Sequence, residues 1–267
     1  MRRHPLPLVQ AWQSRFGLVE EYEYPRGRAE ALPVHAHREM QICFSLDFPG
    51  RYAYRGKLHD VPIGAISILD SWEPHAASDP CDRDRLSHYV MIYVDPLQFR
   101  GGLDLSASAS TGEPIRTDDG IVRRFRALYD ALTTDTSPLE QDERYETFAA
   151  SVFTRAGRRL AEPSPAPLVR ARDYIAAHAC DPISLRDAAA QAALSPWHFV
   201  RAFHRRFGIP PHQFQLAMRI ERARRLLAAG VRSSEVAHRT GFADQSHFVR
   251  SFKRMVRTTP TRYRRAR

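Results

Sequence analysis

The chain has 267 residues, 43% of them hydrophobic, so it is long enough to bury a core and to form two domains. Its apolar runs are too short for a membrane span or a secretory signal, so we expect a cytoplasmic protein without a membrane segment. The formal net charge of +10 is unevenly spread: residues 168–267 contain 20 Lys or Arg against 6 Asp or Glu, whereas residues 1–167 contain 20 against 24.

Residues 30–100 contain several short segments that are rich in aromatic and β-branched residues and are separated by Gly or Pro. Polar and apolar side chains alternate in parts of these segments, as they do in strands with one buried face. The segments are QICFSLDF, YAYRGKLHDV, GAISIL and HYVMIYVD. They predict a small antiparallel β-barrel.

Three histidines and a carboxylate stand out in this region: His35, His37, Glu39 and, in the later segment WEPHA, His75. The pattern resembles a degenerate cupin motif, and in cupin enzymes the analogous residues hold Fe, Mn or Zn. Glu39 follows the histidine pair sooner than that metal pattern requires, which argues against a metal, and we predict instead that the four residues line a ligand pocket. A bound metal and a purely structural role are the alternatives, and no cofactor is expected. The three cysteines are widely spaced and odd in number, so they suggest neither a zinc motif nor a disulfide framework.

Residues 118–134 and 139–160 have apolar side chains at helical spacing, which predicts two amphipathic helices behind the barrel. Such helices are natural elements for packing and for homodimerisation. The stretch AEPSPAP, residues 161–167, has three prolines and no apolar period, which predicts a semi-rigid linker. We therefore expect a cupin-like sensing and dimerisation domain in residues 1–160 and a second domain in residues 168–267.

One sequence motif occurs twice in the basic half, residues 168–267: first as SPWHFVRAFHRR and then as DQSHFVRSFKR. In the first copy Phe199, Phe203 and Phe207 recur every four positions, which places them on one apolar face of a helix. A shorter predicted helix with small residues, and then a tight turn, precedes each copy. The sequence therefore predicts two helix-turn-helix units, at about 184–207 and about 233–256.

A longer helix is predicted between the units, in HQFQLAMRIERARRLLAAG, which has a single apolar stripe and ends at Gly230. A helix of about 18 residues is about 27 Å long, comparable with the ~34 Å of one duplex turn. One chain would then enter two successive major grooves on one face of DNA. The positive charge of this half is typical of polyanion binding, although an arginine-rich solvated surface gives the same count.

Side chains on the faces opposite the phenylalanines are predicted to contact DNA bases, and basic side chains nearer the flanks are predicted to contact phosphates. For Arg201 and Arg250 the alternative is an ion pair within the domain, with Glu221 or Glu235. The predicted base contacts are Trp197, Val200, Arg201, Gln245, Ser246 and Arg250. The predicted phosphate contacts are Arg205, Arg206, Lys253 and Arg254.

Residues 168–267 resemble the DNA-binding domain of the AraC/XylS family, most clearly in the run GFADQSHFVRSFKR followed by TPTRYR. The resemblance implies an α+β multidomain fold, with a cupin-like sensor barrel joined to an all-α domain that contains both helix-turn-helix units. It also implies a one-component transcription regulator, more often an activator than a repressor. Its partners would be double-stranded DNA, a small-molecule effector and RNA polymerase. One departure is Arg257, which stands where the first unit has Gly208, so a shift in the last turn is expected.

Two other functions would use the same residues. A cupin metalloenzyme with an appended basic domain would explain the histidines, but not a helix-turn-helix unit that is present twice. An effector-independent, architectural DNA-binding protein would explain the duplication, but would leave the barrel without a task. We therefore expect a regulator controlled through its N-terminal barrel, and no enzyme activity.

Overall fold

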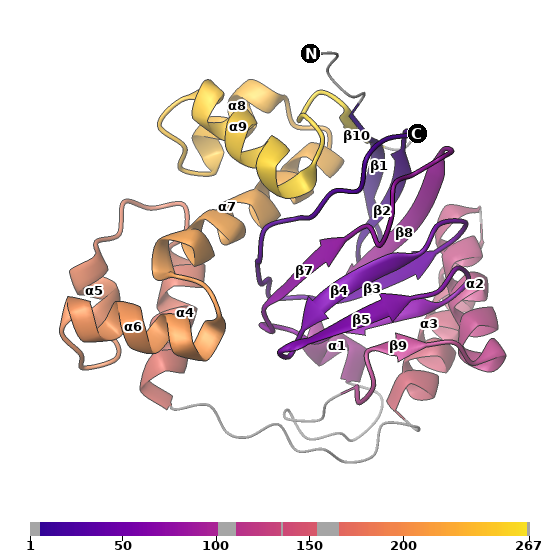
Figure 1. Ribbon diagram of the computed structural model, residues 1–267, viewed down its shortest axis with the longest axis horizontal. Helices are drawn as coiled ribbons and strands as arrows, with labels where there is room; N and C mark the ends of the chain where they lie inside the picture. The colour runs from indigo at the N-terminus through magenta and orange to yellow at the C-terminus, as the bar shows by residue number, and fades with distance from the viewer. Residues whose placement is uncertain (1–5, 101–110, 135, 154–165, 266–267) are drawn as a thin grey trace.

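The computed structural model describes residues 6–100, 111–134, 136–153 and 166–265 (Figure 1). β-Strands backed by helices form the N-terminal half, and helices form most of the C-terminal half, which confirms the predicted α+β class. The strands are β1 Leu8–Gln13, β2 Gly17–Tyr24, β3 Met40–Ser45, β4 Gly50–Tyr54, β5 Lys57–Val61, β6 Ile66–Leu69, β7 His75–Ser78, β8 Ser87–Val94, β9 Ile115–Arg116 and β10 Tyr263–Arg265. The helices are α1 Pro96–Arg100, α2 Asp119–Thr133, α3 Pro138–Phe153, α4 Ala166–Ala177, α5 Leu185–Ala190, α6 Pro196–Phe207, α7 Pro211–Ala228, α8 Ser233–Arg239 and α9 Gln245–Val256.

The predicted barrel consists of two sheets in the described part of the chain. The larger sheet has the strand order β10–β1–β2–β8–β3–β6–β9, and the smaller has the order β5–β4–β7. Within YAYRGKLHDV, Arg55 (φ 50°) and Gly56 (φ 71°) form the left-handed turn of a β4–β5 hairpin. Strands β1, β2 and β7 were not predicted, because the sequences LVQAWQ, GLVEEYEY and HAAS contain Ala and Glu, which are depleted in strands.

The two faces of the larger sheet pack against different parts of the molecule, because successive side chains of a strand point in opposite directions. Ile42 and Phe44 pack with Phe125 of α2 and Phe148 of α3 in one core. Cys43 and its neighbours on the opposite face belong to a second core, which extends into the helical half. Figure 1 shows α2 and α3 on the side of the sheet away from the helical half.

Helices α2 and α3 match the two amphipathic helices predicted behind the barrel, as far as the structure describes them. Asp118 caps α2 by accepting hydrogen bonds from the backbone N–H groups of Gly120 and Ile121. Residues 154–165 lie outside the described residues, and with them the end of the second predicted helix and most of the predicted linker. Helix α4 begins at Ala166, inside the predicted linker, so the domain boundaries drawn from the sequence stay a prediction.

The helical half contains both predicted helix-turn-helix units, α5–α6 and α8–α9, joined by the 18-residue helix α7. The first helix of each unit is shorter than predicted, because the chain turns at Ala193 (φ 53°) and Gly241 (φ 74°). A Cβ atom at Gly241 would lie 2.3 Å from the carbonyl oxygen of Cys180, so only glycine fits this turn.

The two halves share a core and a sheet. Tyr263 begins strand β10, which pairs in parallel with β1 at the edge of the larger sheet. Leu18 and Tyr22 of β2 belong to the same buried cluster as Leu227 of α7 and Phe252 of α9. The second helix-turn-helix unit is therefore packed directly on the N-terminal half.

Candidate DNA-binding surface and ligand cavities

The two predicted recognition helices, α6 and α9, begin and end in the same way. Ser195 caps α6 and Asp244 caps α9, each by accepting a hydrogen bond from the backbone N–H three residues on. Helix α6 ends at Gly208 with φ 69°, and α9 ends at Arg257 with φ 64°. The expected shift of the last turn was therefore wrong: Arg257 adopts the left-handed conformation, which costs a non-glycine residue about 1–2 kcal/mol.

The predicted base contacts lie on the outer faces of these helices. Val200 is half-buried and the other five are exposed. Trp197 is 60% exposed, and exposed apolar area of this kind often marks an interaction site. The guanidinium of Arg201 lies 4.7 Å from the centroid of the Trp197 ring, so the two side chains form one aromatic and cationic platform.

The predicted phosphate contacts are also exposed, at Arg205, Arg206, Lys253 and Arg254. Among the described residues, Glu221 and Glu235, the candidate partners of Arg201 and Arg250, pair with other arginines. Glu221 pairs with Arg225 at 3.1 Å, and Glu235 pairs with Arg239 at 3.4 Å.

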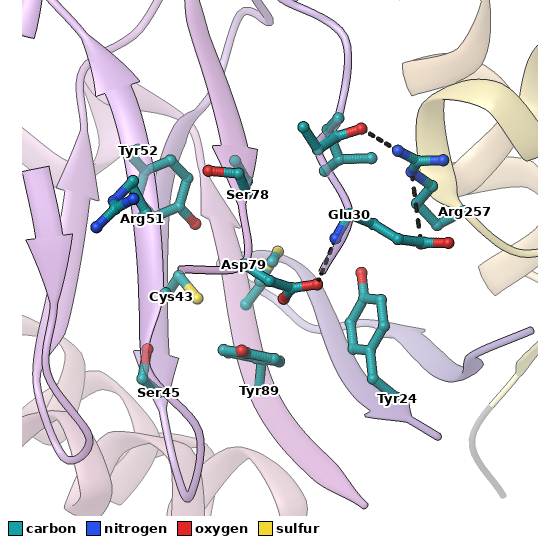
Figure 2. Close-up of a pocket in the computed structure, with 15 residues that line it drawn as sticks. Tyr24, Glu30, Cys43, Ser45, Arg51, Tyr52, Ser78, Asp79, Tyr89 and Arg257 are labelled. Carbon is teal, nitrogen blue, oxygen red and sulfur yellow. Dashed lines mark hydrogen bonds and ion pairs between the residues drawn. The ribbon is translucent and has the colours of Figure 1, made fainter. Parts of the chain in front are cut away.

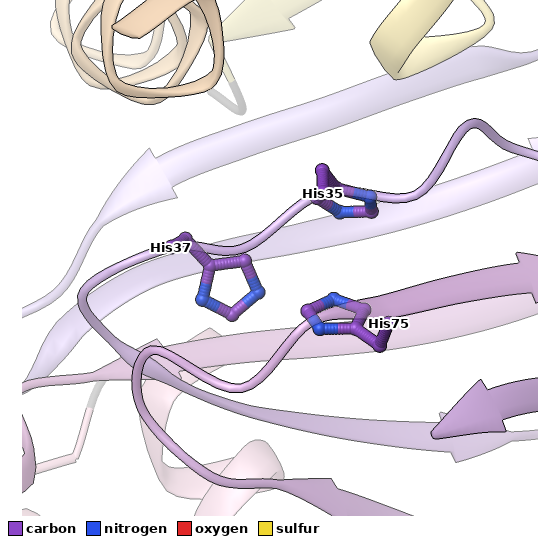
Figure 3. Close-up of side chains that lie close together, drawn as sticks. All are labelled: His35, His37 and His75. Carbon is purple, nitrogen blue, oxygen red and sulfur yellow. The ribbon is translucent and has the colours of Figure 1, made fainter. Parts of the chain in front are cut away.

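His35, His37 and His75 lie together in the N-terminal half (Figure 3). His35 and His75 form an antiparallel bridge in which each backbone N–H donates to the other carbonyl at 2.9 Å. The centroid of the His75 ring lies 4.5 Å from that of His35 and 4.8 Å from that of His37. Burial lowers the pKa of His35 to about 4, and it holds the pKa values of His37 and His75 well below the ordinary value. The three imidazoles are therefore neutral at pH 7.

Glu39, the fourth predicted pocket residue, lies apart from the histidine cluster. Its carboxylate pairs with the guanidinium of Arg225 on α7. The structure thus brings together three of the four predicted residues. Glu39 lies instead in the contact between the halves, where its carboxylate is paired with a guanidinium of α7.

A cavity lies beside the histidine cluster, between the larger sheet and the helical half. From the N-terminal half it is lined by side chains that include His35, His37, His75, Tyr22, Tyr52 and Tyr93. From the helical half it is lined by Ala217, Ile220, Glu221, Arg224, Met255 and Val256.

A second cavity lies between the two sheets, where tyrosine and aliphatic side chains line it together with charged and polar ones (Figure 2). At its rim Arg257, the last residue of the second unit, donates a hydrogen bond to the carbonyl oxygen of Ala31 and lies 4.0 Å from the carboxylate of Glu30. The two cavities share the lining residues Tyr24, Leu32, Tyr52, Ala77 and Met91. The two cavities therefore adjoin, one beside the histidines and the other beside Arg257.

A buried charged network, which sequence analysis missed, links the halves. Glu20 on β2 is 0% exposed, and both of its carboxylate oxygens accept hydrogen bonds from the guanidinium of Arg224, one of them at 2.7 Å. The hydroxyl groups of Tyr22 and Tyr263 also donate to this carboxylate. The sequence does contain a sign that Glu20 is buried: it alternates with the apolar residues Leu18 and Tyr22, so in a strand all three side chains lie on the same, buried face.

Within the described residues, every helix is too short or too polar to cross a membrane.

Residues 188–266 match the model of a protein family described as a helix-turn-helix domain. Over 75 residues the chain is 35% identical to the uncharacterized HTH-type transcriptional regulator YbfI of Bacillus subtilis, a match that covers 28% of this chain and 27% of that protein. A longer match, to the HTH-type transcriptional activator RhaS of Salmonella heidelberg, is 23% identical over 254 residues and covers 91% of each.

The fold is also that of a solved structure, an apo variant of ToxT from Vibrio cholerae, with a TM-score of 0.70 at 13% identity over 94% of this chain and 98% of that one. The duplicated unit, the matching family model, the full-length relatives and the shared fold agree on one assignment. Together they support the resemblance of the chain to transcription regulators of the AraC/XylS family.

Proposed function

We propose that the protein is a sequence-specific DNA-binding transcription regulator. One observation carries the proposal: two helix-turn-helix units expose equivalent faces of α6 and α9 and are joined by the continuous helix α7. A recognition helix reads bases in the major groove, and a second helix held about one duplex turn away reads the next groove on the same face. The basic side chains beside each face supply the sequence-independent attraction to phosphate.

Arg201 and Arg250 are the side chains with the greatest power to discriminate between bases. A guanidinium donates two parallel hydrogen bonds to O6 and N7 of guanine, a pattern that other base pairs do not offer. Trp197 and Val200 would make apolar contacts with thymine methyl groups, and Gln245 and Ser246 would bond to base edges. Arg205, Arg206, Lys253 and Arg254 would hold phosphates on either side.

The regulator is proposed to respond to a small molecule that binds in the N-terminal half. The two adjoining cavities support this role, and a ToxT structure has been solved with an unsaturated fatty acid bound. Because α7, α9 and Arg257 line these cavities, a bound molecule would touch the DNA-binding half directly and bias its position. We further propose that the protein activates transcription, as the relatives named as activators do, and that it contacts RNA polymerase. Homodimerisation through α2 and α3 stays a prediction.

The DNA-binding proposal is tested by selecting the preferred site of the full-length protein from random duplexes and then footprinting it. We expect two protected patches about one helical turn apart on one face of the duplex. A selection that yields no consensus would overturn sequence-specific binding, and a single protected patch would overturn the two-groove geometry.

The effector proposal is tested by filling the space that the two cavities share. Ala77→Leu should abolish the rise in Tm that a panel of unsaturated fatty acids and small organic acids gives with the wild-type chain, because a bound ligand stabilises the folded state. Ala53→Leu is the matched control, since Ala53 is an exposed residue of the adjacent strand β4. Equal ligand shifts in both variants would place the binding site elsewhere.

A further inference from the structure

The three clustered histidines are held in one tautomer by the backbone. Nδ1 of His35 lies 3.0 Å from the carbonyl oxygen of Pro33, Nδ1 of His37 lies 2.8 Å from that of Glu39, and Nδ1 of His75 lies 2.9 Å from that of Glu73. A carbonyl oxygen only accepts hydrogen bonds, so each Nδ1 carries the proton and donates it. Each Nε2 is left with a lone pair.

The lone pair of His75 is the clearest case: its Nε2 is buried and has no hydrogen-bond partner among the described residues. Nε2 of His37 lies 3.2 Å from the side-chain amide of Gln41. A buried acceptor without a donor is destabilising, and native proteins seldom retain one without a function.

The cluster is also built to be rigid. One ring nitrogen from each histidine lies within 4.8 Å of the others, and the double backbone hydrogen bond between His35 and His75 fixes two of the rings on opposite chain segments. The nearest charges are already paired, since Arg224 is bound to Glu20 and Glu39 is bound to Arg225.

We propose that His35, His37 and His75 bind a divalent first-row transition metal ion of the Zn²⁺ class through their Nε2 atoms. Neutral imidazoles are favoured ligands of these ions, and metal-binding histidines typically donate their other ring N–H to a carbonyl oxygen, as all three do here. Metal–nitrogen bonds of about 2.0–2.1 Å require the nitrogens to stand about 3.3 Å apart, so the rings close slightly on the ion. Three protein ligands leave a coordination position for water or for an acceptor atom of a ligand in the adjoining cavity.

This site differs from the four-residue pattern suggested by the sequence, because Glu39 is bound to Arg225 and is not a ligand. It also stands independently of the proposed DNA-binding function, since metal binding requires neither DNA nor an effector.

The test titrates the chelator-stripped, full-length protein with Co²⁺, followed by visible absorption and by metal content per chain. We expect one Co²⁺ per chain, with d–d absorption that disappears when Zn²⁺ displaces it. His37→Ala and His75→Ala should each weaken Co²⁺ binding by more than the 10–100-fold that the loss of an outer-shell partner causes. His59→Ala is the matched control, because His59 lies in the same half with its Nε2 3.2 Å from the carbonyl oxygen of Tyr54, outside the cluster.

Circular dichroism and retained DNA binding check that the variants fold. Should a histidine variant unfold, X-ray absorption of the Zn²⁺-loaded wild-type chain decides, and it must show three nitrogen ligands at about 2.0–2.1 Å. The proposal fails if the wild-type chain binds no Co²⁺, if it binds it as weakly as His75→Ala does, or if His59→Ala alone removes binding. None of these outcomes depends on DNA recognition.

Discussion

Arg201 and Arg250 occupy equivalent positions on α6 and α9, and both are exposed on the outer face. The guanidinium of Arg201 lies over the Trp197 ring, 4.7 Å from its centroid, and this contact favours one position of the side chain. Holding a long side chain before DNA arrives reduces the conformational entropy lost on binding. The first unit is therefore expected to contribute more to specificity than the second.

Removing either guanidinium should weaken specific binding and relax the sequence preference at one base pair. We expect Arg201→Ala and Arg250→Ala each to cost about 1–3 kcal/mol on the selected site, with less effect on random DNA. Competition titrations on single-base variants of the site measure this. Lys253→Ala is the comparison, and it should weaken binding to all duplexes equally and lower the salt dependence. The same uniform loss in Arg201→Ala would show that Arg201 contacts phosphate.

At the scale of elements, the turn between α8 and α9 is the most constrained part of the second unit. Gly241 has φ 74°, and a Cβ atom there would lie 2.3 Å from the carbonyl oxygen of Cys180. Because this oxygen belongs to the backbone, it cannot move aside as a flexible side chain would. The close approach therefore fixes α8 and α9 against the loop that follows α4.

Gly241→Ala should destabilise the protein by clearly more than the ~1 kcal/mol that positive φ costs alanine elsewhere. Gly56→Ala isolates that smaller cost, since Gly56 has φ 71° and open space where its Cβ would be. Urea denaturation of both variants gives the difference between them. Equal losses would mean that the backbone at Cys180 yields without cost, so the turn would not be sterically fixed.

At the scale of the whole molecule, the two halves are tied together by contacts between distant parts of the chain. The first unit meets the N-terminal half where Trp72 packs against the buried cluster that contains Phe203 and Phe207 of α6. The second unit meets it through Phe252 of α9, which lies in one buried cluster with Leu18 and Tyr22 of β2. Strand β10 and the buried pair of Glu20 and Arg224, on α7, add further contacts between the halves. The N-terminal half thus contacts both helix-turn-helix units, which provides a route by which the proposed ligand would alter their spacing.

Breaking the buried pair should destabilise the protein, whereas replacing both members should not. Glu20→Leu and Arg224→Met singly should each cost about 3–5 kcal/mol, because one charge is left buried without its partner. The double variant should recover most of that loss, since two apolar side chains fill the same space. A double-mutant cycle by chemical denaturation measures the coupling. Additive losses would show that the two residues act separately.

The sequence by itself determined the features that depend on local spacing. The helices α6, α7 and α9 follow from apolar side chains at helical intervals and from the capping residues Ser195 and Asp244, all within a few residues of one another. The duplication of the unit is equally local. These features could be predicted because each is set by neighbours in the chain.

Only the tertiary structure decided which distant side chains meet. The carboxylate of Glu20 lies 204 residues from Arg224 in the sequence, and β10 pairs with a strand at the other end of the chain. Four residues were predicted to share a pocket, but only the three histidines lie together. Glu39 is paired with Arg225 of α7, which packs against this part of the N-terminal half. These pairings depend on how the halves pack, because a buried charged side chain must be paired, and packing decides which oppositely charged side chain lies beside it, whatever their separation in the sequence.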